Sequence, residues 1–286
     1  MFGVSRQANY QYLNHQSIHY SQQELIVKQV LEIRANHPKL GTRKLFHMLQ
    51  PFFHENNFKI GRDTLFNLLC QQKLLIRQRQ RKVTTTYSNH WMRKWPNLIK
   101  NYHLNAPNQL WVSDITYWKV MDKFLYISFI TDAYSHKIVG YNLSQQLDMK
   151  SSRNALLIAL KSLPKNQTNL IHHSDRGVQY CAMDYLKLLH QNNIKVSMTE
   201  NGDPKENAIA ERLNGIIKNE YLHKYKPTSF EKAEQLLKHS VELYNIQRPH
   251  LSINYQTPEF THNNQSKTFR KWKNYFKTNP VNVIQD

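Results

Sequence analysis

The sequence predicts a mixed α/β domain preceded by a small all-helical domain, and two observations lead to this prediction. The first is an uneven charge: residues 1–102 hold 16 basic and 4 acidic residues, whereas the rest of the 286-residue chain holds 23 basic and 16 acidic residues. The second is a change from helical apolar spacing to alternating strand and helix patterns. We expect a helical domain at 1–76, a basic linker at 77–102, an α/β domain at 103–265 and a basic tail at 266–286.

Three helices are expected in the first domain. The first begins at a capping box, Ser21–Glu24, in which each end residue satisfies a free backbone N–H of the other. The second follows Thr42, and the third runs from Arg62 to Leu74 with leucines at helical spacing. Short helices in a basic segment are typical of a helix-turn-helix fold that presents side chains to DNA. A small helical bundle with a merely solvated basic surface is the alternative.

Strand and helix patterns alternate in the second domain. Runs of β-branched and aromatic residues predict strands at 109–119, 124–132, 137–143, 169–173 and 195–198. Amphipathic or capped segments predict helices at 149–163, 181–191, 203–221 and 229–245. The third of these begins with Asp203 as N-cap, Pro204 in the first turn and Glu206 completing a box. Three strands followed by helix, strand, helix, strand and helix form the ribonuclease-H-like arrangement.

Composition narrows the function classes. A net charge of +19 implies a polyanionic partner, because Lys and Arg release counterions from phosphates, although a solvated basic surface would look similar. The sequence contains no run of about 18 apolar residues, so no membrane span is expected. The N-terminus lacks the apolar core of a signal peptide. Cys70 and Cys181 are far apart, which indicates no disulfide framework and a reducing, cytosolic setting. His15 and His19 have ligand-like spacing, but no Cys-x-x-Cys accompanies them, so structural zinc is not expected.

Three acidic residues are candidates for a functional site. Asp114 lies inside an apolar strand, where an unpaired carboxylate is expensive to bury. Asp175 follows the strand at 169–173, and ligands gather at strand ends in α/β sheets. Glu211 lies on the helix at 203–221 among small and apolar neighbours. Each acid also has an ordinary explanation, respectively a turn cap, an ion pair with the following arginine and a surface position. Asp132, at the end of the second strand, is a rival ligand.

Carboxylate oxygens indicate the metal and the reaction. They suit Mg²⁺ or Mn²⁺ rather than zinc. Three carboxylates can hold two such ions roughly 3.5–4 Å apart, one activating a water or a 3′-hydroxyl and the other stabilising the leaving oxygen. The expected chemistry is therefore phosphoryl transfer by two metal ions, with no covalent enzyme intermediate.

Several motifs in order resemble one family. Asp114 precedes Asp175 by 60 intervening residues, and 35 residues separate Asp175 from Glu211, which is the D,D(35)E arrangement of retroviral integrases and DDE transposases. More specifically, the chain resembles OrfB, the second-frame product of IS3-family insertion sequences. The stretches that carry this resemblance are Gly41–Lys44, Asn108–Tyr117, His173–Tyr180, Glu206–Glu211, Tyr244–His250 and Thr257–Pro258. Many relatives have Asp where this chain has Glu206, which we attribute to helix capping.

The resemblance implies a transposase whose metal ligands are Asp114, Asp175 and Glu211. It would cut donor DNA at the element ends to free 3′-hydroxyls, which then attack another phosphodiester, through a branched and then circular intermediate. The implied partners are terminal inverted repeats, target DNA, an upstream-frame product (OrfA) joined by frameshift fusion, and further copies on DNA, in the bacterial cytoplasm at the nucleoid. Expected DNA contacts are Arg43, Lys44, Arg62, Thr64, Lys73, Arg77, Arg79, Arg81, Lys82, Lys218 and Arg248.

Two other functions remain open at this point. A DNA-binding regulator or an inactive transposase relic would use only residues 1–102 and would not need the three acids. A ribonuclease H or junction nuclease could share the fold, because fold does not dictate function. The basic helical domain and the motif Tyr244–His250 argue against such a nuclease.

Overall fold

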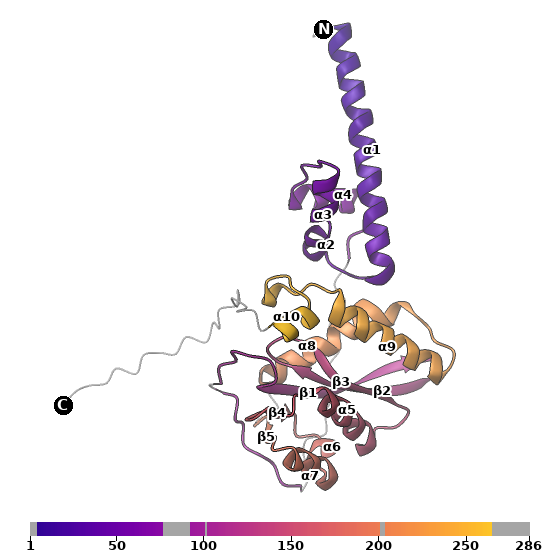
Figure 1. The fold of residues 1–286 in the computed structure, drawn as a ribbon. Coiled ribbons are helices and arrows are strands. Elements are labelled where there is room, and N and C mark those ends of the chain that lie inside the picture. The colour runs from indigo at the N-terminus through magenta and orange to yellow at the C-terminus, as the bar shows by residue number, and fades with distance from the viewer. Residues whose placement is uncertain (1–4, 77–91, 101, 201–203, 265–286) are drawn as a thin grey trace, which may run out of the picture.

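The computed structural model describes residues 5–76, 92–100, 102–200 and 204–264, which form a helical unit and a domain built on a five-stranded sheet (Figure 1). The helical unit contains α1 (Arg6–Asn36), α2 (Thr42–Met48), α3 (Gln50–Glu55) and α4 (Arg62–Gln71). Most of α1 extends away from the molecule, and its C-terminal part packs against the shorter helices (Figure 1). The buried apolar side chains in the described part of this unit are Ile26, Val30, Leu40, Leu45, Leu49, Phe53, Leu65, Leu68 and Leu69.

Helix α1 is longer than the sequence pattern predicted. It begins after Ser5, whose hydroxyl accepts a hydrogen bond from the backbone N–H of Ala8 at 3.2 Å. The predicted start at Ser21–Glu24 is wrong, because those residues lie inside the helix. No Gly or Pro interrupts α1, and Ser, Gln and Glu are tolerated in a helix interior as well as at a cap. Helix α3 was not predicted, and Pro51 lies in its first turn, where a missing N–H is harmless.

The sheet has the strand order β3-β2-β1-β4-β5. Strands β1 (Leu110–Val120), β2 (Lys123–Asp132) and β3 (Ile138–Ser144) form an antiparallel meander. Strands β4 (Ile171–Ser174) and β5 (Lys195–Met198) extend it in parallel from β1. Every strand bound lies within two residues of the predicted one, so the predicted mixed, ribonuclease-H-like sheet is confirmed.

Helices cover both faces of the sheet (Figure 1). On one face, α5 (Met149–Ser162), α6 (Val178–Cys181) and α7 (Met183–Gln191) build a core with Trp111 and Ile130. On the other face, α8 (Ala208–Ile216) and α9 (Phe230–Ile246) build a second core with Ile127 and Phe129. The remaining elements are η1 (Pro204–Asn207), η2 (Ile217–Tyr221, a π-helical turn), η3 (Leu222–Lys224), η4 (Leu251–Ile253) and α10 (Pro258–Asn264).

Two predicted helices differ from the structure. The helix expected at 181–191 corresponds to α7 but begins two residues later, because Ala182 is extended, with ψ 137°, and the short helix α6 before it was not predicted. The helix expected at 203–221 becomes η1, α8 and η2 in succession. Its expected N-cap, Asp203, lies outside the described residues. Glu206 accepts a hydrogen bond from the backbone N–H of Glu200 at 2.6 Å, so it ties the helix start to the segment after β5.

The helical unit and the sheet domain meet through polar and aromatic contacts. His37 Nδ1 lies 2.9 Å from the hydroxyl of Tyr221, and this pair is buried. The ring of His47 stacks on that of Tyr255, with the centroids 4.7 Å apart. Residues 92–100, within the predicted linker, run along β5, where the backbone N–H of Leu98 donates to Ser197 Oγ at 2.9 Å. None of the described helices is both long and apolar enough to span a membrane.

Candidate active site

The register of β1 and β4 brings Asp114 and Asp175 side by side. The two strands run parallel, and their last paired residues are Ser113 and Ser174. Asp114 and Asp175 follow directly on each strand, and neighbouring strands lie about 4.8 Å apart. Two carboxylates that are distant in sequence therefore emerge at the same end of the paired segment.

Helix α8 brings the third acid to this position. Glu211 lies in its first turn and is exposed, and Asn207 and Asn214 flank it on the same side of the helix. Asn207 Nδ2 donates to the backbone oxygen of Ser113 at 2.9 Å, and Asn214 Nδ2 donates to Asp114 Oδ2 at 2.7 Å. These two bonds fasten α8 across β1, so that Glu211 lies beside the aspartates.

The electrostatics of Asp114 show that the three acids interact. Burial, followed by the negative charges of Asp175 and Glu211, raises the pKa of Asp114 to about 8. Hydrogen bonds from the Ile115 backbone and from Asn214 act in the opposite direction, because they favour the charged carboxylate. A bound cation would offset the negative charges of Asp175 and Glu211 and would favour the ionised carboxylate of Asp114.

The turn after β4 holds Asp175 in place. The backbone N–H of Gly177 donates to Asp175 Oδ1 at 3.0 Å. A Cβ atom on residue 177 would lie 2.9 Å from that same oxygen, so a side chain there would push the carboxylate aside. The buried hydroxyl of Tyr180 feels both aspartates, and burial is the first cause of its raised pKa, followed by charges that include Asp175 and Asp114.

The three carboxylates do not converge on one point. Within the described ranges, no three His, Cys, Asp or Glu side chains are grouped closely enough to hold a single metal ion. Like charges repel each other, and backbone or amide donors already hold oxygens of Asp114 and Asp175. The acids are thus neighbours that influence one another, each with its own protein partners.

Asp132, the rival ligand, has a structural role. Its side chain is fully buried, and Oδ2 accepts from the backbone N–H of Asn108 at 2.7 Å. Oδ1 accepts from both the N–H and the hydroxyl of Ser135, each at 2.7 Å. Both oxygens are therefore occupied: Oδ1 closes the turn between β2 and β3, and Oδ2 holds the segment before β1.

Two predicted DNA contacts have different surroundings. Lys218 lies in η2 next to the acids: its Nζ is 4.7 Å from the ring centroid of Tyr117, and burial lowers its pKa while the charge of Asp114 raises it. Arg248, in contrast, is 1 % exposed and binds Glu220 through two nitrogens, each at 2.8 Å. The predicted DNA contact at Arg248 is therefore wrong, because its guanidinium is buried and already bound to Glu220.

The predicted DNA contacts in the helical unit also differ in how exposed their side chains are. Arg43, Arg62, Thr64 and Lys73 are exposed. Lys44 is only partly exposed, and burial followed by the charge of Arg248 lowers its pKa to about 8. Lys44 thus faces the sheet domain. The predicted contacts Arg77, Arg79, Arg81 and Lys82 lie outside the described residues.

Sequence reasoning missed the two asparagines that support the acids. Asn207 and Asn214 stand four residues before and three residues after Glu211, on one side of a helix. Amide side chains at these spacings from a suspected ligand are a usable signal when the helix is expected to pack on a sheet. The orientation of both amides depends on the strand register, which the sequence does not give.

Comparison with known proteins identifies the family. Residues 105–204 and 192–258 match two family models, each described as "Integrase core domain". An uncharacterised 31 kDa protein of insertion element IS600 from Shigella sonnei is 35% identical over 264 residues, which cover 90% of this chain and 94% of that protein. The transposase for insertion sequence element IS629, also from Shigella sonnei, is 29% identical over 213 residues, or 74% of this chain and 70% of that protein.

A solved structure agrees at the level of the fold. A chain of the simian T-cell lymphotropic virus intasome in complex with PP2A regulatory subunit B56 gamma aligns with a TM-score of 0.50 and 16% identity, over 82% of this chain and 74% of that chain. The sequence matches define a polynucleotidyl transferase with an integrase core, and the solved structure agrees with its fold. The chain belongs to the insertion-sequence DDE transposases, which act in DNA transposition and integration, and the relatives fit the IS3 family.

Proposed function

We propose that Asp114, Asp175 and Glu211 are the catalytic, metal-binding residues of this transposase. The observation that carries the proposal is the β1–β4 register, which places two carboxylates side by side while α8 adds the third. The donors are all hard oxygens, and burial first and then the negative charges of Asp175 and Glu211 raise the pKa of Asp114, so a divalent cation there would favour its ionised form. Two Mg²⁺ or Mn²⁺ ions would supply activation of the attacking oxygen and stabilisation of the leaving oxygen.

The chain's own residues prepare the site for this chemistry. Asn214 fixes one oxygen of Asp114, and the Gly177 N–H fixes one oxygen of Asp175, so both carboxylates are held before DNA arrives. Lys218, beside Asp114, would neutralise a DNA phosphate next to the scissile bond. The reaction is cleavage at the element ends to free 3′-hydroxyls, followed by attack of those hydroxyls on another phosphodiester.

DNA binding would extend from this site to the helical unit. Arg43, Arg62, Thr64 and Lys73 are exposed there and remain the proposed contacts. The substrates would be terminal inverted repeats and target DNA, bound by several copies of the chain and by a fusion with the upstream-frame product. Because its substrates are DNA, the enzyme would act at the bacterial nucleoid in the cytoplasm.

Replacing Asp175 with Asn tests the proposed site. The change keeps the size of the side chain but removes the charge, so Mg²⁺- or Mn²⁺-dependent nicking and joining of element-end DNA should be lost while DNA binding persists. Asp184→Asn is the matched control, because Asp184 is an exposed acid in the first turn of α7 and lies outside the site. Gel assays of labelled element ends measure both reactions.

Two outcomes would contradict the proposal. Strand joining that survives in Asp175→Asn would show that this carboxylate is not needed. Tight, metal-independent DNA binding by the unsubstituted chain without any cleavage, even after fusion to the upstream product, would favour a regulator or an inactive relic.

A further inference from the structure

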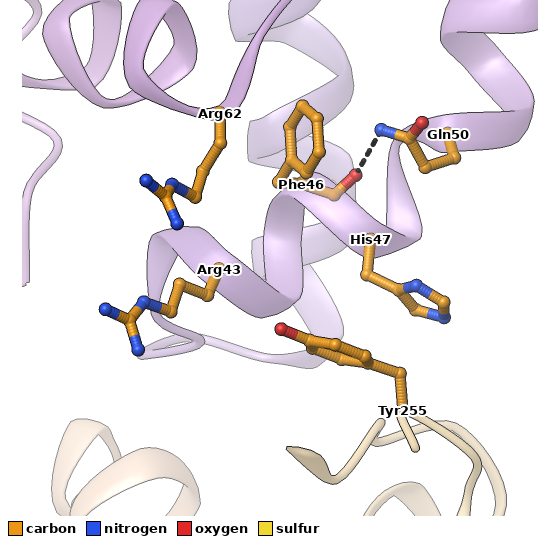
Figure 2. A pocket seen from close by; sticks show the side chains of 6 residues that line it. All are labelled: Arg43, Phe46, His47, Gln50, Arg62 and Tyr255. Carbon is orange, nitrogen blue, oxygen red and sulfur yellow. Dashed lines mark hydrogen bonds between the residues drawn. The ribbon is translucent and has the colours of Figure 1, made fainter. Parts of the chain in front are cut away.

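A pocket lies where the helical unit meets the sheet domain, and we call it the junction pocket (Figure 2). Its volume is about 480 Å³, which is within the usual range of ligand sites. Helices α2, α3 and α4 contribute five of its lining residues, and the loop after η4 contributes the sixth, Tyr255. The full lining is Arg43, Phe46, His47, Gln50, Arg62 and Tyr255.

The lining of the junction pocket suits an anion. Figure 2 shows the side chains of Arg43 and Arg62 next to each other, with the hydroxyl end of Tyr255 pointing toward their side of the pocket. None of the six lining residues is acidic. Arg62 binds Asp63 at 2.9 Å, but both side chains are exposed, and such surface pairs are weak enough to be exchanged for another anion.

Tyr255 is held in a conformation that an ordinary turn would not require of a bulky residue. Its φ is 61°, in the left-handed region, and that of the preceding Asn254 is 58°. Asn tolerates this region, whereas a tyrosine there is strained. The backbone N–H of Tyr255 donates to the oxygen of His250 at 2.7 Å, and its ring stacks on His47 at 4.7 Å. Strained residues that are fixed by several contacts cluster at functional sites.

The hydroxyl of Tyr255 lies on the same side of the junction pocket as the guanidinium groups of Arg43 and Arg62 (Figure 2). Two guanidinium forks and a phenol hydroxyl are the donors that bind phosphate oxygens, because the arginine fork matches their geometry and charge. A phosphodiester is therefore the ligand that fits these groups.

We propose that the junction pocket binds a backbone phosphate of DNA, and that Tyr255 of the sheet domain completes a site begun by Arg43 and Arg62 of the helical unit. This proposal rests on the proposed function, since it takes DNA as the substrate. One phosphate contacted from both domains fixes the DNA held by the helical unit relative to Asp114, Asp175 and Glu211. The buried contact between His37 and Tyr221 maintains the same arrangement from within the protein.

Tyr255→Phe is the decisive variant, because it removes the hydroxyl and retains the ring that stacks on His47. We expect duplex DNA to bind the full-length variant about 10- to 150-fold more weakly than the unsubstituted chain, as for the loss of one hydrogen bond to a charged group. The salt dependence of binding should not change, because no charge is lost. Tyr225→Phe, at another exposed tyrosine, is the matched control and should bind normally.

The arginines provide the complementary measurement. Arg43→Gln and Arg62→Gln should each reduce the slope of log affinity against log salt by about 0.9, as for one lost phosphate contact. Arg153→Gln is the control. It removes an equal charge from the exposed side of α5, on the face of the sheet opposite α8 and α9, and should leave the salt slope near its original value. Fluorescence anisotropy with a labelled duplex measures all of these variants, and thermal unfolding verifies their folding.

The results separate this proposal from the active-site proposal. Tyr255→Phe should lose DNA affinity while its three acids stay intact, whereas Asp175→Asn should bind DNA with normal affinity and neither nick nor join it. Normal DNA affinity in Tyr255→Phe would overturn the composite site, and so would unchanged salt slopes in both arginine variants. Neither result would affect the assignment of the three acids.

Discussion

The amide of Asn214 donates to one oxygen of Asp114, and the backbone N–H of Ile115 donates to the other. A carboxylate fixed at both oxygens can keep one orientation despite the nearby charges of Asp175 and Glu211. Mutation of a residue that orients a metal ligand typically costs about 10- to 100-fold in metal affinity or activity. At the residue scale, Asn214 is therefore a positioning residue for the proposed site.

Replacing Asn214 with Ala should lower strand-joining activity by about 10- to 100-fold, because the Asp114 carboxylate would lose a fixed donor. DNA affinity should stay the same. The matched control is Asn219→Ala, at an exposed asparagine in η2. The test measures the rate of strand joining over a range of Mg²⁺ or Mn²⁺ concentrations, and DNA affinity is measured separately. Normal activity at every metal concentration would show that the amide has no part in positioning Asp114.

Arg248 shows where motif-based prediction fails at this scale. The motif Tyr244–His250 helped to reveal the family, yet its arginine is buried against Glu220, and Arg248 Nη1 lies 2.9 Å from His250 Nε2. Removing one partner of a buried ion pair destabilises a protein by about 3–5 kcal/mol, so such a residue is needed for folding. The sequence motif identifies Arg248 as typical of the family, but its burial depends on the contact with Glu220, which is distant in sequence.

At the scale of elements, Gly140 allows helix α5 to approach strand β3 closely. A Cβ atom at this position would lie 2.2 Å from the backbone oxygen of Ala155 and 2.9 Å from the Cβ of Ala159. Backbone atoms cannot move aside as a flexible side chain can. The requirement for glycine here follows from contact between elements, since β3 itself would accept an alanine.

Gly140→Ala should therefore destabilise the fold by about 1–3 kcal/mol, as for an overpacked core. Gly215→Ala is the matched control, because the nearest atom to a Cβ there is Asn219 Nδ2 at 4.0 Å inside helix α8, and its change should be neutral or slightly stabilising. Urea unfolding curves followed by circular dichroism give both values. Equal stability of the two variants would mean that α5 can shift away from β3 without loss.

The strands were predictable because their signals are local. Runs such as Leu110–Val120 combine β-branched and aromatic residues, and turns bound them clearly. The helices were less predictable where only tertiary contacts decide. The length of α1, the break at Ala182 and the π-helical turn of η2 depend on packing that no short window of sequence contains. Likewise, three acids could be named from motifs, but their alignment depends on the β1–β4 register.

At the scale of the whole molecule, buried histidines make stability depend on pH. Burial lowers the pKa of His172 to about 3 and, together with the charge of Arg248, lowers that of His250 well below its ordinary value. An unfolded chain would protonate both near pH 6.5, whereas the folded chain would not. Below that pH the unfolded state binds more protons, so the free energy of unfolding decreases as the pH falls.

Asp114 has the opposite effect, since its pKa of about 8 lets the folded state bind a proton that an unfolded carboxyl releases. Between about pH 6 and pH 4 the unfolded state gains two protons at the histidines and the folded state keeps one at Asp114, so the free energy of unfolding should decrease as the pH falls.

His172→Gln should reduce the pH slope of the unfolding free energy by up to about 1.4 kcal/mol per pH unit. Urea unfolding with a chelator present, from pH 7.5 downward, measures the slope, and His103→Gln at an exposed position is the control. A slope that is the same in both variants would mean that His172 becomes protonated within the folded protein.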